Sequence, residues 1–356
     1  MKIDAANVVV NLCANLDMLK VILLLSAVAL APAVDGADKA TAPNSWPARV
    51  FAPYMYVGSG DNFKLTECDD ACGQKFYTLA FIISDRSNNP AWDGRIPVDQ
   101  NFYADQIAAI RARGGDVIMS FGGEAGKDIA IVETNPATLE TKYQSVVDRY
   151  HFRWLDFDIE GKNLEDSAAN QRRNTALATL QLKNPGLIIS YTLPVNPHGL
   201  SEDAQKLLAD AKAKGLKIHS ADLMVMYFGK EFIHKGKSEG ELGIDSANVA
   251  HAQIQKIDPA IRIGLCPCLG RNGSQDEVFT LEDARTLKAF ADRTPWICSL
   301  HFWSINKDAA RPRRKRIANT ATNEASVAGF NTNRVATPGA QQPWAFAKIF
   351  QIFAAR

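Results

Sequence analysis

Three acidic residues stand at alternate positions in one otherwise apolar segment of the chain. The segment reads Trp154-Leu155-Asp156-Phe157-Asp158-Ile159-Glu160-Gly161. Side chains at alternate positions of a β-strand share one face, so the three carboxyl groups point the same way. Carboxyl groups held so close together cannot all ionise freely, and at least one of their pKa values must rise. A raised pKa suits a general acid at mild pH, and Glu160, at the end of the segment, is the candidate.

Such a row of acids needs a scaffold, and apolar segments of strand length recur along the chain between stretches with helical spacing. Eight segments of this kind are found, at residues 50–57, 76–83, 116–122, 154–160, 187–195, 221–228, 261–266 and 297–303. Strands alternating with helices indicate an α/β fold with a parallel sheet. Eight such units predict a (β/α)8 TIM barrel that forms a single catalytic domain over residues 45–356.

The barrel determines where the acids would lie. They would line its interior, with Glu160 at the carboxyl end of the strands, where the active sites of barrels are found. A doubly wound open sheet is the competing architecture, but no glycine-rich phosphate-binding loop follows the first strand. A surface strand with a solvated acidic face is the other alternative, and the parallel-type strands that flank the segment argue against it.

The two ends of this pattern differ from its middle. Residues 21–33 form an apolar run after Met18 and Lys20, which predicts an N-terminal leader with a secretory signal peptide over residues 1–37, a true start at Met18 and a secreted, extracellular protein. The run is short for a membrane span, so we expect no membrane association after cleavage. Residues 307–343 lack periodicity, and their basic cluster at 311–316 is interpreted as a solvated loop before a last helix over 344–353.

Composition limits the partners. Lysine and arginine together number 40 and aspartate and glutamate 39, so no overall charge favours nucleic acid or an anionic membrane, and a neutral polymer is a suitable substrate. Histidine and cysteine do not stand at metal-ligand spacing, so we expect no metal and no cofactor. Cys68 and Cys72 are near enough in sequence to close one small loop, whereas Cys266, Cys268 and Cys298 are expected to be buried. We expect a monomer.

Four motifs, in order along the predicted strands, give the chain a family resemblance. They are the Asp-x-Asp-x-Glu run at 156–160, the Ser-x-Gly-Gly motif within 117–123, the segment 268–280 and the segment Phe302-Trp303-Ser304-Ile305-Asn306-Lys307-Asp308. Together they resemble glycoside hydrolase family 18, specifically the bacterial-type chitinases, from about Tyr54 to the last helix. The resemblance implies cleavage of β-1,4 linkages in chitin and chitooligosaccharides by substrate-assisted retaining catalysis, without a protein nucleophile.

The resemblance also implies roles for particular residues. Glu160 would protonate the glycosidic oxygen, Asp158 would orient the acetamido group that attacks the anomeric carbon, and Asp156 would tune Asp158. Trp303 would form the floor of the subsite for the distorted sugar. The other predicted substrate-binding residues are Tyr227, Tyr191, Ser120, Gly122 and Met226. Tyr191, an aromatic residue in a barrel strand, could equally be packing.

The sixth strand departs from the family pattern. Tyr227 stands where related enzymes have an aspartate, and Phe228 where many have a tyrosine, which puts the polar contacts of the reacting amide in doubt. Two alternatives therefore stay open: a weak or inactive chitin-binding lectin, and an endo-β-N-acetylglucosaminidase acting on N-glycans. No long insertion separates the seventh and eighth strands, which predicts a shallow, open groove and endo cleavage.

Overall fold

The computed structural model describes residues 46–59, 64–233, 236–273, 276–309 and 342–355. The predicted leader and the basic cluster at 311–316 lie outside the described residues. The described residues all belong to one compact unit of the chain.

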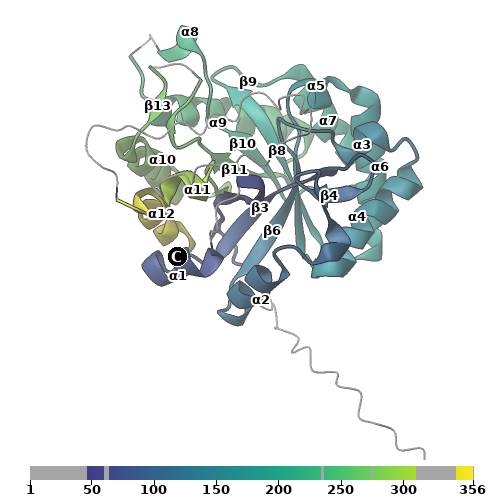
Figure 1. The fold of residues 1–356 in the computed structure, drawn as a ribbon. Coiled ribbons are helices and arrows are strands. Elements are labelled where there is room, and N and C mark those ends of the chain that lie inside the picture. Colours follow the sequence, from purple (N-terminus) through teal and green to yellow (C-terminus); the bar gives the residue numbers. More distant parts are fainter. Residues whose placement is uncertain (1–45, 60–63, 234–235, 274–275, 310–341, 356) are drawn as a thin grey trace, which may run out of the picture. The chain divides into compact units, whose positions relative to one another are not determined.

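Each of the eight predicted strands is present in a largely parallel sheet (Figure 1). The first segment is split into β1 (Val50–Phe51) and β2 (Tyr54–Tyr56). The others are β3 (Phe76–Ser84), β6 (Asp116–Gly122), β7 (Trp154–Asp158), β8 (Ile188–Asn196), β10 (Ser220–Met224), β11 (Arg262–Cys266) and β14 (Ile297–Leu300). Consecutive strands in this series pair in parallel, as repeated βα units require.

The split first segment closes the sheet into a barrel. β1 pairs in parallel with β14, and β2 pairs in parallel with β3. At the break, Ala52 N–H donates to the carbonyl of Leu300 at 2.9 Å, and Thr78 N–H donates to the carbonyl of Pro53 at 3.0 Å. Proline has no N–H to give a ladder, so the break at Pro53 loses little pairing. The predicted α/β barrel is therefore confirmed.

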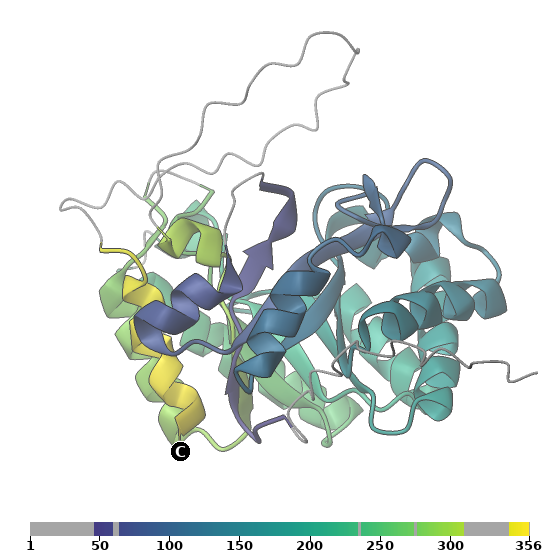
Figure 2. The same cartoon turned by 60° about the horizontal axis from the view of Figure 1, so that its bottom comes forward.

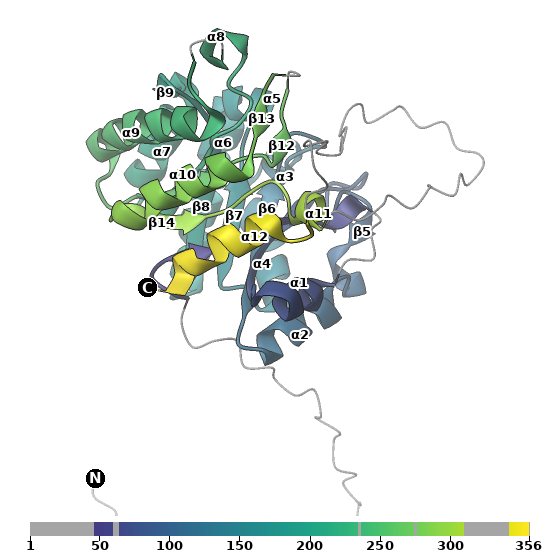
Figure 3. The same ribbon diagram turned by 90° about the vertical axis from the view of Figure 1, so that its left-hand side faces the viewer.

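Helices surround the barrel (Figures 1 and 2). The longer ones are α1 (Leu65–Cys72), α2 (Ala104–Ala112), α4 (Pro136–Tyr150), α6 (Ser167–Lys183), α7 (Glu202–Ala213), α9 (Glu239–Ile257), α10 (Leu281–Arg293) and α12 (Ala345–Phe350). Neighbours in the series α4, α6, α7, α9, α10 and α12 pack on one another, and Figure 3 shows α9, α10 and α12 side by side. Helices outside and side chains inside bury both faces of each strand, which explains the nearly continuous apolar runs.

Shorter helices and strands lie in the loops between the barrel elements. They are α3 (Ile129–Val132), α5 (Gly161–Glu165), α8 (Lys230–Ile233), α11 (Ile305–Asp308), β4 (Pro90–Trp92), β5 (Ile96–Pro97), β9 (Gly199–Leu200), β12 (Gly270–Arg271) and β13 (Val278–Phe279). Short 3-10 helices cover Val57–Ser59, Val98–Gln100 and Gln351–Ala355. The last of these follows α12, so the predicted final helix is α-helical only in its first part.

Three strands end well before the predicted residue: β14 stops at Leu300, and the other two, β7 and β10, carry predicted site residues at their ends. β7 ends at Asp158, and Glu160 already stands at the N-terminal cap position of α5. β10 ends at Met224, and Tyr227 then adopts a left-handed backbone with φ of 53°. In both places the chain turns away from the barrel axis. Glu160 and Tyr227 therefore lie beyond the carboxyl ends of their strands rather than within them.

The described cysteines are free thiols. Cys68 and Cys72 lie one turn apart on α1 with their Sγ atoms 3.4 Å apart. Cys266, Cys268 and Cys298 are buried, as the sequence predicts. Within the described ranges, no helix combines the length and apolar character that crossing a membrane requires.

Candidate active site

Asp156 lies deepest of the three acids of β7, inside the barrel, and is surrounded by hydroxyl groups. Tyr54 and Ser120 contact its Oδ2 at 2.8 and 2.7 Å. Ser190 and Thr192 contact its Oδ1 at 2.9 and 3.0 Å. Burial and the nearby Asp222 raise the pKa of Asp156 to about 6, although the hydroxyl donors act against that rise. Asp156 therefore sits at the centre of a fixed polar network with little freedom to move.

Asp158 and Glu160 continue toward the mouth of the barrel with few polar neighbours. Asp158 is buried, and within the described residues its Oδ1 has no hydrogen-bond partner. Burial, Glu160 and Asp156 together hold the pKa of Asp158 well above its usual value. Burial and the carboxyl group of Glu124 raise the pKa of Glu160 to about 7. Glu160 can therefore carry a proton near neutral pH, as a general acid must.

A charged pair lies beneath this series in the barrel. His301 Nε2 and Asp222 Oδ2 are 3.5 Å apart, and Ser299 donates to Asp222 Oδ1 at 2.9 Å. Burial opposes ionisation of both partners, but their mutual attraction outweighs it. The pKa of Asp222 is therefore lowered and that of His301 is raised. Asp222 keeps its negative charge, which in turn favours protonation of Asp156.

Trp303 and Met226 form an apolar floor beside the acids. Trp303 stacks on Phe81 with ring centroids 5.6 Å apart and an interplanar angle of 17°, and it contacts Tyr54 and Tyr56 at 5.9 Å. Met226 packs, half-buried, on the same cluster. The Trp303–Ser304 and Ala80–Phe81 peptide bonds are both cis. An aromatic surface of this kind suits the apolar face of a sugar ring.

The Ser-x-Gly-Gly motif holds β6 against β7. Ser120 donates to Asp156, as described above, whereas Gly122 contributes through its backbone. Gly122 has φ of 94°, and a Cβ atom there would lie 2.1 Å from the carbonyl oxygen of Asp158. Only glycine permits this close approach. Ser120 and Gly122 thus hold β6 against the strand that carries the acids, and a contact of either residue with substrate stays a prediction.

Tyr191 needs correction as a residue of the cleft. It is fully buried, and its hydroxyl donates to Asn174 of α6, on the helix side of β8. Its neighbours Ser190 and Thr192 face Asp156 instead. Alternation along a strand sends Tyr191 outward whenever Ser190 and Thr192 point inward. Tyr191 is therefore a packing residue, the alternative that the sequence left open.

The departure in the sixth strand takes a definite shape in the structure. Phe228 is buried in the main hydrophobic core, so it does not stand in the position of a substrate-binding tyrosine. Tyr227 is 55% exposed, and its hydroxyl lies 3.9 Å from Cys268 Sγ. Tyr227 therefore offers a ring, and not a carboxylate, at the edge of the site.

Four residues of the site are missing from the sequence-based set: Tyr54, Ser190, Thr192 and Glu124. Alternation would have found Ser190 and Thr192, since they share the inward face with the acids of β7. Glu124 follows the Ser-x-Gly-Gly motif directly, but its approach to Glu160 depends on the turn after β6. Glu124 and Glu160 line one cavity of about 290 Å³ together with Gly126, Gly161, Lys162 and Asn163.

Across the described residues, no group of three or more His, Cys, Asp and Glu side chains is arranged to share a metal ion. The chemistry that the site can perform is therefore inferred from its carboxyl groups and aromatic side chains. That chemistry consists of the Glu160 carboxyl group with a pKa of about 7, the buried Asp158 carboxyl group whose Oδ1 has no hydrogen-bond partner among the described residues, and an aromatic floor beside them.

Known proteins share both the sequence and the fold. No protein-family model matches the chain. It is 30% identical over 292 residues to a probable bifunctional chitinase/lysozyme of Escherichia coli, covering 75% of this chain and 32% of that protein. It is 30% identical over 285 residues to endochitinase 11 of Metarhizium anisopliae, covering 75% of this chain and 54% of that protein. The chain thus spans between a third and about half the length of these curated relatives.

A solved structure matches over nearly its whole length. The catalytic domain of a hyperthermophilic chitinase from Pyrococcus furiosus superposes with a TM-score of 0.72 at 30% identity, covering 88% of this chain and 97% of that domain. Catalytic-site mutants of that domain have also been solved in complex with chito-oligosaccharides. At this identity and coverage, the chain belongs to the chitinases of glycoside hydrolase family 18.

Proposed function

We propose that this chain hydrolyses β-1,4 linkages between N-acetylglucosamine units of chitin, with Glu160 as general acid and base and with retention of anomeric configuration. The observation that carries the proposal is the position of Glu160: it stands at the mouth of the barrel with a pKa raised to about 7. A carboxylic acid that is half protonated near neutrality can give a proton to a leaving oxygen and later take one from water.

The acetamido group of the substrate would act as the nucleophile. Its carbonyl oxygen would bond to the anomeric carbon as the bond to the leaving oxygen breaks, and Glu160 would supply the proton that the leaving oxygen needs. Water would then open the oxazolinium ring and return a proton to Glu160. Holding the carbonyl next to the carbon replaces a second carboxylate, because proximity supplies much of the rate.

Asp158 is placed to serve that step. Its buried Oδ1, which lacks a partner in the described structure, can accept a hydrogen bond from the acetamido N–H. In its ionised form, Asp158 would stabilise the positive charge that grows on the acetamido group. Asp156, fixed by four hydroxyl groups, would keep Asp158 in place, and Trp303 would support the sugar.

The first test is the Glu160→Gln variant with the N-acetylglucosamine hexamer, analysed by mass spectrometry. We expect the parent to give dimer, trimer and tetramer, as endo cleavage requires, and the variant to lose activity by roughly 10²–10⁴-fold. Glu165→Gln is the matched control, because Glu165 is an exposed residue of the same short helix α5. Equal hydrolysis by Glu160→Gln and the parent would overturn the assignment.

The test also separates the alternatives. Hexamer binding without any cleavage by the parent would favour a lectin. The reason to test for a lectin is that Tyr227 replaces the aspartate of related enzymes. Cleavage of N-glycans but not of chitin oligomers would favour an endo-β-N-acetylglucosaminidase. Proton NMR during the first minutes of hydrolysis should show the β-anomer of the new reducing end first, because a retaining mechanism releases it.

We propose further that the protein acts as a secreted monomer. The apolar run at 21–33 supports export, and the balance of 40 basic and 39 acidic residues suits a neutral polymer outside the cell. N-terminal sequencing of protein recovered from the culture medium should find a new start near residue 37. Light scattering should give the mass of a single chain.

A further inference from the structure

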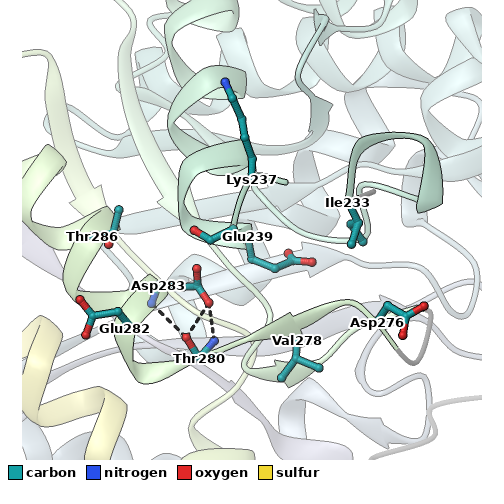
Figure 4. Close-up of a pocket in the computed structure, with 10 residues that line it drawn as sticks. Ile233, Lys237, Glu239, Asp276, Val278, Thr280, Glu282, Asp283 and Thr286 are labelled. Atoms are coloured by element: carbon teal, nitrogen blue, oxygen red, sulfur yellow. Dashed lines mark hydrogen bonds between the residues drawn. The ribbon is translucent and has the colours of Figure 1, made fainter. Parts of the chain in front are cut away.

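A second acidic cavity lies on the face of the barrel that carries Glu160. Its volume is about 310 Å³. One wall is formed by Ile233 and Lys237–Glu239, which follow β10, and the other by residues between Asp276 and Thr286, which follow β11 (Figure 4). Both segments leave the carboxyl ends of barrel strands, so the cavity belongs to the face where barrels bind substrates.

Glu239 is the distinctive group of this cavity. Glu239 is only 6% exposed, yet neither of its carboxyl oxygens has a hydrogen-bond partner in the described structure. Figure 4 shows its side chain reaching into the space between Ile233 and the Val278–Asp283 segment. Buried carboxyl groups are almost always hydrogen-bonded or paired, so one that faces a cavity without a partner points to a missing ligand.

The start of α9 does not need this carboxyl group. Ser238 and Glu241 form a capping box, with Glu241 N–H donating to Ser238 Oγ at 3.3 Å and Ser238 N–H donating to Glu241 Oε2 at 2.9 Å. Gly240 N–H donates to Asp283 Oδ1 at 2.9 Å. The backbone N–H groups of Ser238, Gly240 and Glu241 therefore have partners other than Glu239. The Glu239 carboxyl group is not used to cap the helix and can bind a ligand.

The charge of the cavity favours a cation. Asp276, Glu282 and Asp283 share its lining with Glu239, and the basic residue among the described lining residues, Lys237, has its ammonium group paired with Asp245. Burial, together with Glu277 and Asp283, raises the pKa of Glu239 to about 8. Glu239 therefore holds a proton at neutral pH and would give it up to a ligand that brings a positive charge.

We propose that this cavity binds the protonated amine of a glucosamine unit in partially deacetylated chitin, with Glu239 as the ion-pair partner. The proposal rests on the function proposed above. A primary ammonium group is the one cation that such a polymer carries. A metal ion is a poorer match, because no group of three metal-binding side chains is found in the part of the chain that the structure describes.

The cavity is joined to the active site through one loop. Glu277, which stands between the lining residues Asp276 and Val278 in the sequence, accepts a hydrogen bond from Gly229 N–H, two residues beyond Tyr227. A polymer lying across Tyr227 would therefore pass near the cavity. Recognition of an amine there would direct the enzyme toward chitin segments that carry free amino groups next to acetylated units.

The test is isothermal titration of a fully deacetylated glucosamine tetramer into the full chain carrying Glu160→Gln, at about pH 6 and low salt, where the amines are charged. We expect Glu239→Gln, added to that background, to weaken binding at least tenfold. Binding should release close to one proton, measured from heats in buffers of different ionisation enthalpy, and Glu239→Gln should abolish that release.

Controls make each outcome decisive. Glu165→Gln should leave binding of the tetramer unchanged, and Asp276→Asn, an exposed position of the lining, should weaken it by a smaller factor. Binding that is absent, or is insensitive to Glu239→Gln in a variant with a parental melting curve, overturns the proposal. If Glu239→Gln fails to fold, the background protein and Asp276→Asn decide the question: both should release close to one proton per tetramer bound, and binding without proton release in either overturns the proposal. Failure of the N-acetylated tetramer to bind would count separately against the proposed function.

Discussion

Four acidic side chains follow one another along the barrel interior, and the shift in pKa differs among them because their surroundings differ. The pKa of Asp222 is lowered beside His301, Asp156 is held by hydroxyl groups, Asp158 is buried with an Oδ1 that has no hydrogen-bond partner in the described structure, and Glu160 lies at the mouth next to Glu124. Identical chemistry thus gives separate roles. The sequence shows three of these acids in a row, but only their surroundings show which of them can donate a proton.

Glu124 gives the first prediction at the scale of residues. Its carboxylate is a cause of the raised pKa of Glu160, so Glu124→Gln should lower that pKa. A general acid works only while protonated, so activity falls as pH rises through its pKa, here about 7. We expect the alkaline limb of the kcat/KM profile to move to lower pH by on the order of half a unit.

The control is Glu165→Gln, which removes one negative charge from the same region without touching the cavity of Glu160. Its alkaline limb should coincide with that of the parent. Added salt should also reduce the difference between Glu124→Gln and the parent, because Glu124 is exposed and its field is screened. An alkaline limb that stays in place in Glu124→Gln would show that the field of Glu124 does not govern Glu160.

At the scale of elements, alternation along strands accounts for much of what the sequence predicts and for one of its errors. Asp156 and Asp158 face the interior as the pattern requires, and the same rule places Thr192 inward and Tyr191 outward. The errors lie where strands stop. The turn after β10 buries Phe228 and exposes Tyr227, and no period of two or of 3.6 residues extends into a turn.

The contact between β6 and β7 gives a prediction of its own. Gly122→Ala would place a Cβ atom 2.1 Å from the carbonyl oxygen of Asp158, at a φ of 94°. We expect a loss of roughly 3 kcal/mol in the free energy of unfolding, together with a larger loss of activity, because β7 must shift and carry Asp158 with it. Denaturant titration and hydrolysis of the hexamer would measure the two effects.

Gly186→Ala is the matched control for this strain. Gly186 has a similar φ of 90°, but a Cβ atom there would meet nothing within 4 Å. It should therefore cost only the backbone strain, about 1 kcal/mol, and leave activity intact. If Gly122→Ala behaved like Gly186→Ala in both measurements, the close approach of β6 to β7 would not be what positions Asp158.

At the scale of the whole molecule, closing the barrel brings Asp158 into a site where ionisation is unfavourable. Its pKa is raised in the folded protein relative to the unfolded chain. Between those two pKa values the unfolded chain binds fewer protons than the folded protein, so the free energy of unfolding falls as pH rises. The stability cost is absent in acid and present at neutral pH, and it would accompany the ionisable group that the proposed mechanism requires at Asp158.

Asp158→Asn should therefore make the protein more stable and nearly inactive. At pH 7 we expect the free energy of unfolding to rise by about 1–2 kcal/mol, which amounts to a few degrees in Tm, while at about pH 4 the variant and the parent should melt together. Scanning calorimetry across this pH range measures the effect. Asp148→Asn on the exposed side of α4 is the control and should change Tm little at either pH. A gain in Tm that was equal at both pH values would mean that the amide improves packing and that the buried charge is not the source of the cost.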